Sequence, residues 1–185
     1  MPASADFPPP HPDPLRPGGR RGVVLRLLSV STSRRESRRY PDRPIVGVLA
    51  VVLRGERALV VRRSNPPMAG RWGFPGGVLE LGETVAQGAM RELLEETGVV
   101  AEPLGPLTVI DTIDRDDEER VRFHYTLVAV RGLWVSGEGI AADDADEVAW
   151  LSRAEIVEGG LLTAPALLPL IDLALKTQGA ATQRE

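Results

Sequence analysis

Glu92, Glu95 and Glu96 recur at helical spacing in the middle of this 185-residue chain. At 100° per residue, the three carboxylates fall within about 100° of one another on one side of a helix. Like charges at this spacing destabilise a helix slightly, and the macrodipole disfavours them near the helix C-terminus. A bound divalent cation would reverse both effects, and carboxylate oxygens favour Mg²⁺ or Mn²⁺. We therefore expect a metal site, with a solvated acidic face as the alternative.

Local signals place these glutamates on a helix over residues 85–97. Thr84 fits the N-cap, Gln87 completes a capping box, and Gly98 fits the left-handed position that ends a helix. A different, broad face of this helix is apolar and comprises Ala86, Ala89, Met90, Leu93 and Leu94. We expect the helix to pack against a sheet through that apolar face.

The glutamates belong to a longer pattern that starts at Gly77. From there to Val99 the sequence reads GVLELGETVAQGAMRELLEETGV, with fixed positions at Gly77, Glu83, Arg91, Glu92, Glu95, Glu96 and Gly98. This pattern resembles the signature of the Nudix hydrolases, enzymes that cleave a nucleoside diphosphate linked to another group. Two glycines in the preceding run WGFPGG allow the backbone to approach a ligand closely. In the same run, we expect Trp72 and Phe74 to be core residues.

The resemblance implies a role for each residue of the signature. The carboxylates of Glu92, Glu95 and Glu96 and the backbone carbonyl of Gly77 would hold two or three Mg²⁺ or Mn²⁺ ions. Either Glu92 or a carboxylate from a distant loop would take the proton of the attacking water. We expect Arg91 to orient a glutamate through a charge-assisted hydrogen bond. We expect Glu83 to act as an anchor behind the metal ligands.

Two acidic clusters outside the signature could supply the loop carboxylate. One comprises Asp143, Asp144, Asp146 and Glu147. Within it we select Glu147 as the candidate base, because the following Val-Ala-Trp resembles the context of such a residue in relatives. A polar residue at a strand edge is the alternative for Glu147. In the other cluster, we expect Glu118 and Glu119 to be solvated charges on a hairpin.

Composition narrows the chemistry further. The chain has no cysteine and only two histidines, which excludes disulfides, thiol nucleophiles and cysteine-bound zinc and disfavours a histidine-centred mechanism. No apolar run approaches the ~20 residues that a membrane span needs, so we expect a cytoplasmic protein. Residues 1–44 carry a net charge of +5, which leaves −9 for the rest of a chain whose total is −4. An acidic domain needs metal ions to hold a polyphosphate.

Proline, glycine and arginine set the first 40 residues apart. We expect residues 1–40 to be a disordered extension, 41–178 to be the hydrolase domain, and 179–185 to be a flexible tail. The paired arginines before the short apolar run 23–30 do not make an export signal, because Arg26 interrupts that run. A strand or helix over 23–30 that docks on the domain is the alternative.

Regular structure begins at Ile45. The apolar, β-branched run 45–53 predicts a buried central strand, and 57–63 predicts its hairpin partner. Further strands are expected over the ranges 107–113, 121–130 and 147–151, a short helix over 153–157, and a C-terminal helix from about 163 to 176. Strands interrupted by one helix and closed by another predict an α+β fold. This predicted fold agrees with the α/β/α sandwich that the Nudix resemblance implies, in which a mixed sheet lies between helices.

Three runs outside the signature are similar to bacterial Nudix proteins labelled ADP-ribose pyrophosphatases: 40–48, 59–63 and 121–125. The resemblance implies a nucleotide as small-molecule partner, ADP-ribose or a related nucleotide sugar, and allows a homodimer. We expect no membrane or nucleic-acid partner. The alternatives are oxidised dNTPs, NADH or RNA 5′ ends as substrates, or a sensor module without catalysis. The intact set of glutamates argues against a sensor.

Overall fold

The computed structural model describes residues 38–65, 68–143 and 145–182. The expected N-terminal extension up to residue 37, including the run 23–30, lies outside the described residues, as do residues 183–185. Tyr40 was assigned to the extension, yet its backbone N–H donates to the Arg122 carbonyl at 2.8 Å, so it belongs with the folded part. The last helix continues through Thr182, past the expected domain boundary at residue 178.

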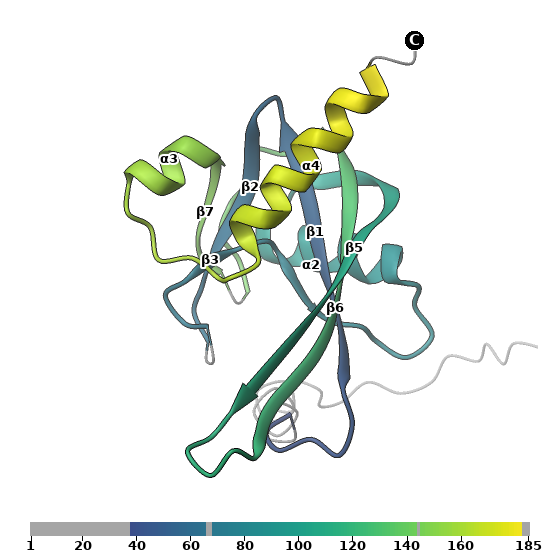
Figure 1. Ribbon diagram of the computed structural model, residues 1–185. Coiled ribbons are helices and arrows are strands. Elements are labelled where there is room, and N and C mark those ends of the chain that lie inside the picture. Colours follow the sequence, from purple (N-terminus) through teal and green to yellow (C-terminus); the bar gives the residue numbers. More distant parts are fainter. Residues whose placement is uncertain (1–37, 66–67, 144, 183–185) are drawn as a thin grey trace, which may run out of the picture. The chain divides into compact units, whose positions relative to one another are not determined.

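A seven-stranded mixed sheet forms the centre of the molecule (Figure 1). Its main path runs β3-β2-β1-β6-β5, while β4 pairs with β1 and β7 pairs with β2. The strands are β1 (Ile45–Arg54), β2 (Arg57–Arg63), β3 (Trp72–Gly73), β4 (Gly76–Val78), β5 (Val100–Arg115), β6 (Val121–Ser136) and β7 (Ala145–Ser152). Of the pairings described, β1 with β6 is parallel and the others are antiparallel. The apolar β1 is central, as its sequence predicts.

Helices cover both faces of this sheet (Figure 1). Side chains alternate along β1, so Val48, Ala50 and Val52 pack with α2 (Val85–Thr97), whereas Val51 packs with α4 (Leu167–Thr182). Helix α3 (Arg153–Glu158) contributes Ile156 to the α4 side. The arrangement confirms the expected mixed sheet between helices. Trp72 and Phe74 are buried on the α4 side and are core residues, as expected.

Helix α2 spans the residues that its capping signals predict. Thr84 forms the capping box with Gln87, and Gly98 ends the helix at a φ of 66°. The apolar face is narrower than expected, because Leu94 is 52% exposed, while Ala89 and Leu93 are fully buried. No helix in the described part of the chain is both long and apolar enough to cross a lipid bilayer.

Strands β5 and β6 are longer than predicted, at 16 residues each. The first half of β5 contains Pro103, Gly105 and Pro106, which are typical of loops. An edge strand tolerates such residues, and the pairing of β5 with β6 shifts register at these positions. The C-terminal helix starts later than predicted, at Leu167, because Thr163 forms a bridge to Trp72.

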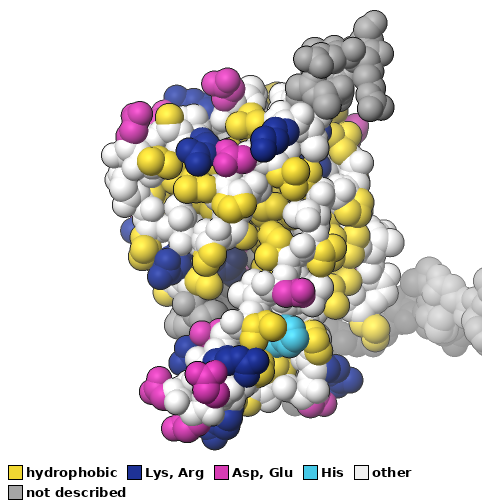
Figure 2. Space-filling model, viewed as in Figure 1, with side chains coloured by type: hydrophobic (Ala, Val, Ile, Leu, Met, Phe, Trp, Pro, Cys, Tyr) yellow, Lys and Arg dark blue, Asp and Glu magenta, His cyan; other side chains and the backbone are white. Residues whose placement is uncertain are grey.

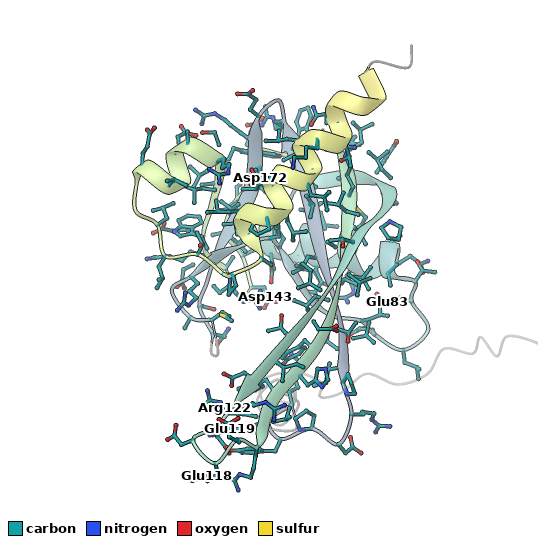
Figure 3. The ribbon with its side chains drawn as sticks, viewed as in Figure 1. Glu83, Glu118, Glu119, Arg122, Asp143 and Asp172 are labelled. Atoms are coloured by element: carbon teal, nitrogen blue, oxygen red, sulfur yellow. The ribbon has the colours of Figure 1, made fainter. Side chains whose placement is uncertain are left out.

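The tip of the β5–β6 hairpin is charged (Figure 2), and Figure 3 labels Glu118, Glu119 and Arg122 there. Asp116 organises this tip by accepting hydrogen bonds from the Tyr40 hydroxyl and from Arg120, both within 2.9 Å. Desolvation would raise the pKa of Asp116, but these hydrogen bonds and the charge of Arg120 lower it to about 2. Glu118 and Glu119 are exposed on this hairpin, as expected.

Candidate active site

Two glycines of β4 lie where a side chain would overlap neighbouring atoms of β1 or α2. Gly76 and Gly77 pair with Leu49 and Val48 of β1. A Cβ atom at Gly76 would lie 2.1 Å from the Val48 carbonyl oxygen, and one at Gly77 would lie 2.3 Å from Oε1 of Glu92. No larger side chain fits at either position unless neighbouring atoms move. The backbone of Gly77 therefore lies directly against the carboxylate of Glu92.

The three helix glutamates differ in exposure. Glu96 is only 4% exposed, and its carboxylate accepts a hydrogen bond from the Gly76 N–H at 3.1 Å. The side chain of Glu92 is 14% exposed, whereas that of Glu95 is 50% exposed. The structure thus brings Gly77, Glu92 and Glu96 together at the α2–β4 contact, with Glu95 at its solvent edge.

Arg91 joins the carboxylates of the signature. Its guanidinium donates to Glu83 at 2.7 and 3.1 Å, to Glu92 at 2.8 Å and to Glu95 at 3.1 Å. The hydrogen bond to Glu83, together with Glu92, raises the pKa of Arg91 above its ordinary value, and the same bond lowers the pKa of Glu83. Arg91 therefore contacts three glutamates, where the sequence predicts that it orients one.

Burial raises the pKa of Glu92. The charges of Glu95 and Asp143 raise it further, while the hydrogen bond and charge of Arg91 lower it in part. Asp143 belongs to the loop between β6 and β7, and its neighbour Ala142 donates a backbone hydrogen bond to the Glu96 carbonyl at 3.0 Å. Asp143, which Figure 3 labels, is thus an acidic residue outside α2 whose charge acts on Glu92.

Glu147 is positioned differently from Asp143. It lies on β7 opposite Arg62 of β2, forms an ion pair with that arginine at 2.9 Å, and is 53% exposed. The context that favoured Glu147, Val-Ala-Trp, is a strand sequence. Asp143 belongs to the same acidic cluster of the sequence, in which the local context favours Glu147 instead. Gly137 and Gly139, both at positive φ, indicate a turn before Asp143 but not that this turn brings the chain back to α2.

The donor atoms fit a hard divalent cation. Every candidate ligand is a carboxylate or carbonyl oxygen, the type that Mg²⁺ and Mn²⁺ prefer. Across the described residues, however, no three acidic or histidine side chains converge closely enough to hold an ion as they stand. Arg91 instead bridges Glu92 and Glu95. The oxygen ligands therefore suit Mg²⁺ or Mn²⁺. In the observed structure, Arg91 holds the side chains of Glu92 and Glu95.

The face of the sheet beside Gly77 carries aromatic and basic residues. A Cβ atom at Gly47 would lie 2.7 Å from Cδ2 of Leu127 and 3.1 Å from the Gly77 carbonyl oxygen, so both border Gly47. Two residues before Leu127 on β6, Tyr125 stacks on Phe123 with a centroid distance of 6.4 Å. Burial raises the pKa of Tyr125, and the charges of Arg38 and Arg63 partly counter this.

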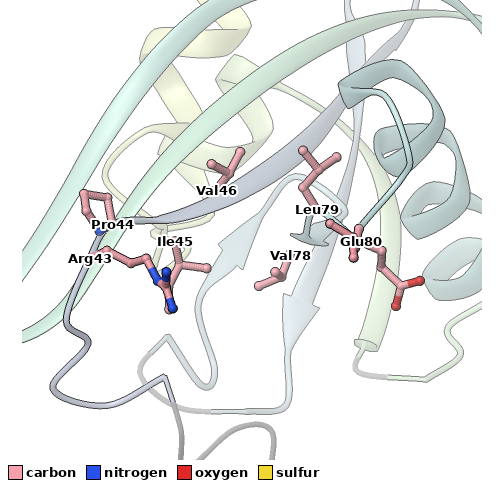
Figure 4. A pocket seen from close by; sticks show the side chains of 8 residues that line it. Arg43, Pro44, Ile45, Val46, Val78, Leu79 and Glu80 are labelled. Atoms are coloured by element: carbon pink, nitrogen blue, oxygen red, sulfur yellow. The ribbon is translucent and has the colours of Figure 1, made fainter.

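An open depression of about 420 Å³ lies between the start of β1 and the end of β4 (Figure 4). Mostly aliphatic side chains line it: Arg43, Pro44, Ile45, Val46, Val78, Leu79, Glu80 and Leu81. It touches the signature loop through Glu80, whose N–H donates to Glu83 at 2.6 Å. None of the α2 glutamates lines it, so the carboxylates, not this depression, define the candidate centre.

We predict that Gly77→Ala inactivates the protein while leaving it folded. The new methyl group would overlap the Glu92 carboxylate and push it away from the backbone. A Gly55→Ala variant is a partial control, since its Cβ meets no atom within 4 Å although its φ of 62° is strained. The measurement is turnover of ADP-ribose alongside circular dichroism. Turnover within twofold of wild type in a folded Gly77→Ala protein would contradict the site.

Comparison with known proteins identifies the family to which the chain is similar. The family model described as NUDIX domain matches residues 43–170. The chain is 36% identical over 104 residues to ADP-ribose pyrophosphatase of Methanocaldococcus jannaschii. The aligned residues make up 56% of this chain and 59% of that protein. It is also 36% identical over 110 residues to Putative 8-oxo-dGTP diphosphatase 2 of Mycobacterium tuberculosis, covering 59% and 74% of the two chains.

Among solved structures, one similar protein is a bifunctional NMN adenylyltransferase/ADP ribose pyrophosphatase from Francisella tularensis, complexed with AMP and a manganese ion. The TM-score is 0.60 at 28% identity, and the match covers 80% of this chain and 46% of that one. The chain therefore spans less than two thirds of the length of both pyrophosphatases named here.

Proposed function

The chain belongs to the Nudix family, and from this premise we propose that it hydrolyses the diphosphate linkage of a nucleoside diphosphate derivative, with ADP-ribose as substrate. Water attacks one phosphorus atom, the P–O–P bond breaks, and the bridging oxygen leaves with the other phosphate. The proton of the attacking water passes to a carboxylate. The products are AMP and ribose 5-phosphate.

The observation that carries the proposal is the packing of the α2 carboxylates against the glycine backbone of β4. Glu92 lies against Gly77, and Glu96 accepts from the Gly76 N–H. One buried and one largely buried carboxylate beside a glycine backbone are costly unless cations or hydrogen bonds compensate them. In the described structure Arg91 supplies part of that compensation.

A divalent cation, Mg²⁺ or Mn²⁺, would neutralise the diphosphate and acidify the attacking water when bound. The Gly77 carbonyl and the carboxylates of Glu92, Glu95 and Glu96 are the groups that would hold it. Arg91 positions Glu92 and Glu95 through the bonds described above, and Glu83 fixes Arg91 in turn. Loss of Glu83 would therefore disturb the positions of Glu92 and Glu95 through Arg91.

Three carboxylates are candidates for accepting the proton. Burial raises the pKa of Glu92, which makes its carboxylate a stronger base for accepting a proton. Asp143 is the loop residue whose charge acts on Glu92, so it is a second candidate. A role of Glu147 as the base remains a prediction. Its ion pair with Arg62 favours a role in holding β7 on β2. We favour Glu92 or Asp143 over Glu147.

The aromatic face of β6 is our candidate for the nucleoside. Leu127 and the Gly77 carbonyl both border Gly47, and Tyr125 lies two residues before Leu127 on β6, about 7 Å away at ~3.3 Å per residue. Stacked Phe123 and Tyr125 offer a flat apolar surface, and Arg38 and Arg63 bring positive charge next to it. The combination suits a base or ribose attached to a diphosphate.

An oxidised dNTP is the second candidate substrate, since the mycobacterial relative carries that name at the same identity. A substrate panel separates the two: ADP-ribose, NADH, a dinucleoside polyphosphate, 8-oxo-dGTP and a capped RNA, each with Mg²⁺. We expect the highest kcat/KM for ADP-ribose, with AMP and ribose 5-phosphate as products. A higher kcat/KM for 8-oxo-dGTP would overturn the substrate assignment but leave the reaction class intact.

A further inference from the structure

Arg54, the last residue of β1, lies between two indole rings. Its guanidinium carbon is 4.4 Å from the ring centroid of Trp134 on β6 and 5.0 Å from that of Trp150 on β7. Both distances are within the range of a cation–π contact. The guanidinium also donates to the Glu138 carboxylate at 2.8 Å. We refer to Arg54, Trp134, Trp150 and Glu138 as the arginine clamp.

The hydrogen-bond donors of the arginine clamp all find their acceptors in residues 137–138. The indole N–H of Trp134 donates to the Gly137 carbonyl at 2.9 Å. The indole N–H of Trp150 donates to the Glu138 carbonyl at 2.8 Å. Residues 137–138 begin the loop between β6 and β7, whose described residues, 137–143, we call the acidic loop. The clamp therefore fixes the start of the acidic loop from both sides.

The acidic loop then runs along the C-terminal end of α2. Gly137 has a φ of 92°, and a Cβ there would lie 2.8 Å from the Gly98 carbonyl oxygen. The backbone N–H of Ile140 donates to the Thr97 carbonyl at 2.9 Å, and that of Ala142 donates to the Glu96 carbonyl at 3.0 Å. Carbonyls in the last turn of a helix lack partners within it, so these bonds satisfy them.

Asp143 follows directly after these two bonds. It adopts a φ of 48°, a left-handed conformation that is uncommon for non-glycine residues and that aspartate adopts more readily than most. The bonds to Thr97 and Glu96 and the clamp at residues 137–138 restrain the backbone that leads to it. The charge of Asp143 also acts on Glu92, which agrees with this placement.

We propose that Arg54 is a positioning residue: the arginine clamp holds the acidic loop on the last turn of α2 and thereby sets the position of Asp143 beside Glu92. Arg54 itself is remote from the reaction. It lies six residues beyond Val48, the partner of Gly77, which corresponds to about 20 Å along β1. We expect any effect of Arg54 on turnover to pass through the loop. The catalytic consequence rests on the proposed function, whereas the structural link does not.

Hydrogen–deuterium exchange of the full chain tests the structural link without any substrate. In Arg54→Gln we expect the amides of residues 140–142 to exchange at least tenfold faster than in wild type, with the interior of α2 unchanged. Arg153→Gln is the matched control: it breaks an exposed ion pair with Asp172 on α4 (2.8 Å) and should leave the loop unaffected. Unchanged exchange at 140–142 in Arg54→Gln would overturn the proposal.

Kinetics test the consequence for Asp143. With ADP-ribose and Mg²⁺, Arg54→Gln should lower kcat about tenfold with KM within twofold, and Arg54→Lys should recover part of the loss. When Asp143→Asn is already present, adding Arg54→Gln should lower kcat by less than a further twofold. Independent, multiplicative losses would show that Arg54 does not act through Asp143. If wild type cleaves no nucleotide, the proposed function fails, and the exchange result still decides the structural link.

A milder variant covers the case in which Arg54→Gln does not fold. Trp150→Phe keeps an aromatic ring beside Arg54 but removes the hydrogen bond to the Glu138 carbonyl. We expect faster exchange at residues 140–142 and a threefold to tenfold fall in kcat. Wild-type exchange in this folded variant would also overturn the proposal.

Discussion

Glu96→Gln should lower kcat on ADP-ribose about 100-fold or more, a loss of about 2.7 kcal/mol of transition-state stabilisation. The glutamine keeps the shape of the side chain and still accepts from the Gly76 N–H through its carbonyl oxygen. It removes one negative charge from a nearly fully buried position, where a charge cannot be replaced by solvent. Steady-state kinetics with saturating Mg²⁺ measure the effect.

The other two helix glutamates refine this prediction. Glu95 is half exposed and sits at the rim of the group, so raised Mg²⁺ should restore Glu95→Gln in part. Glu92 is more buried and is a candidate for the proton acceptor, so Glu92→Gln should recover less. Glu158→Gln, at an exposed end of α3, is the control and should keep wild-type kcat. Equal recovery of Glu92→Gln and Glu95→Gln would remove the distinction between their roles.

Removal of divalent metal should abolish turnover altogether. We expect no hydrolysis in excess EDTA, full recovery with Mg²⁺ or Mn²⁺, and a higher Tm when either ion is added. The pKa of Glu92 is raised, so its contribution to folding is fully present at low pH and is lost as pH rises through that raised pKa. Metal binding needs the ionised carboxylate, so the gain in Tm from Mg²⁺ should grow over the same rise in pH. Full activity in a chelator would contradict the mechanism.

Local signals explain what the sequence predicts well. The bounds of α2 follow from Thr84, Gln87 and Gly98, which act within one turn of the helix ends. The spacing of the glutamates follows from helical geometry alone. β1 and β2 were predictable because continuous apolar runs bounded by turn residues leave few other assignments.

Long-range contacts explain what the sequence does not predict. Pro103 and Pro106 favour a loop in the sequence. A strand forms there because β5 is at the edge of the sheet, where proline is tolerated. Arg91 could be expected to reach one glutamate, but its contact with Glu83, eight residues earlier, depends on how the loop folds back. The approach of Asp143 to Glu92 depends on the turn at residues 137–139, which spacing along the chain does not reveal.

The proposed hydrolysis of the diphosphate linkage depends on the carboxylates of α2. The most direct test is hydrolysis of ADP-ribose with Mg²⁺ by a folded variant in which Glu92, Glu95 and Glu96 are all glutamine, with products followed by ³¹P NMR. We predict that wild type releases AMP and ribose 5-phosphate, while the triple variant yields no product above the uncatalysed rate. Release of the same products by the triple variant at the wild-type rate would show that this helix is not the active site.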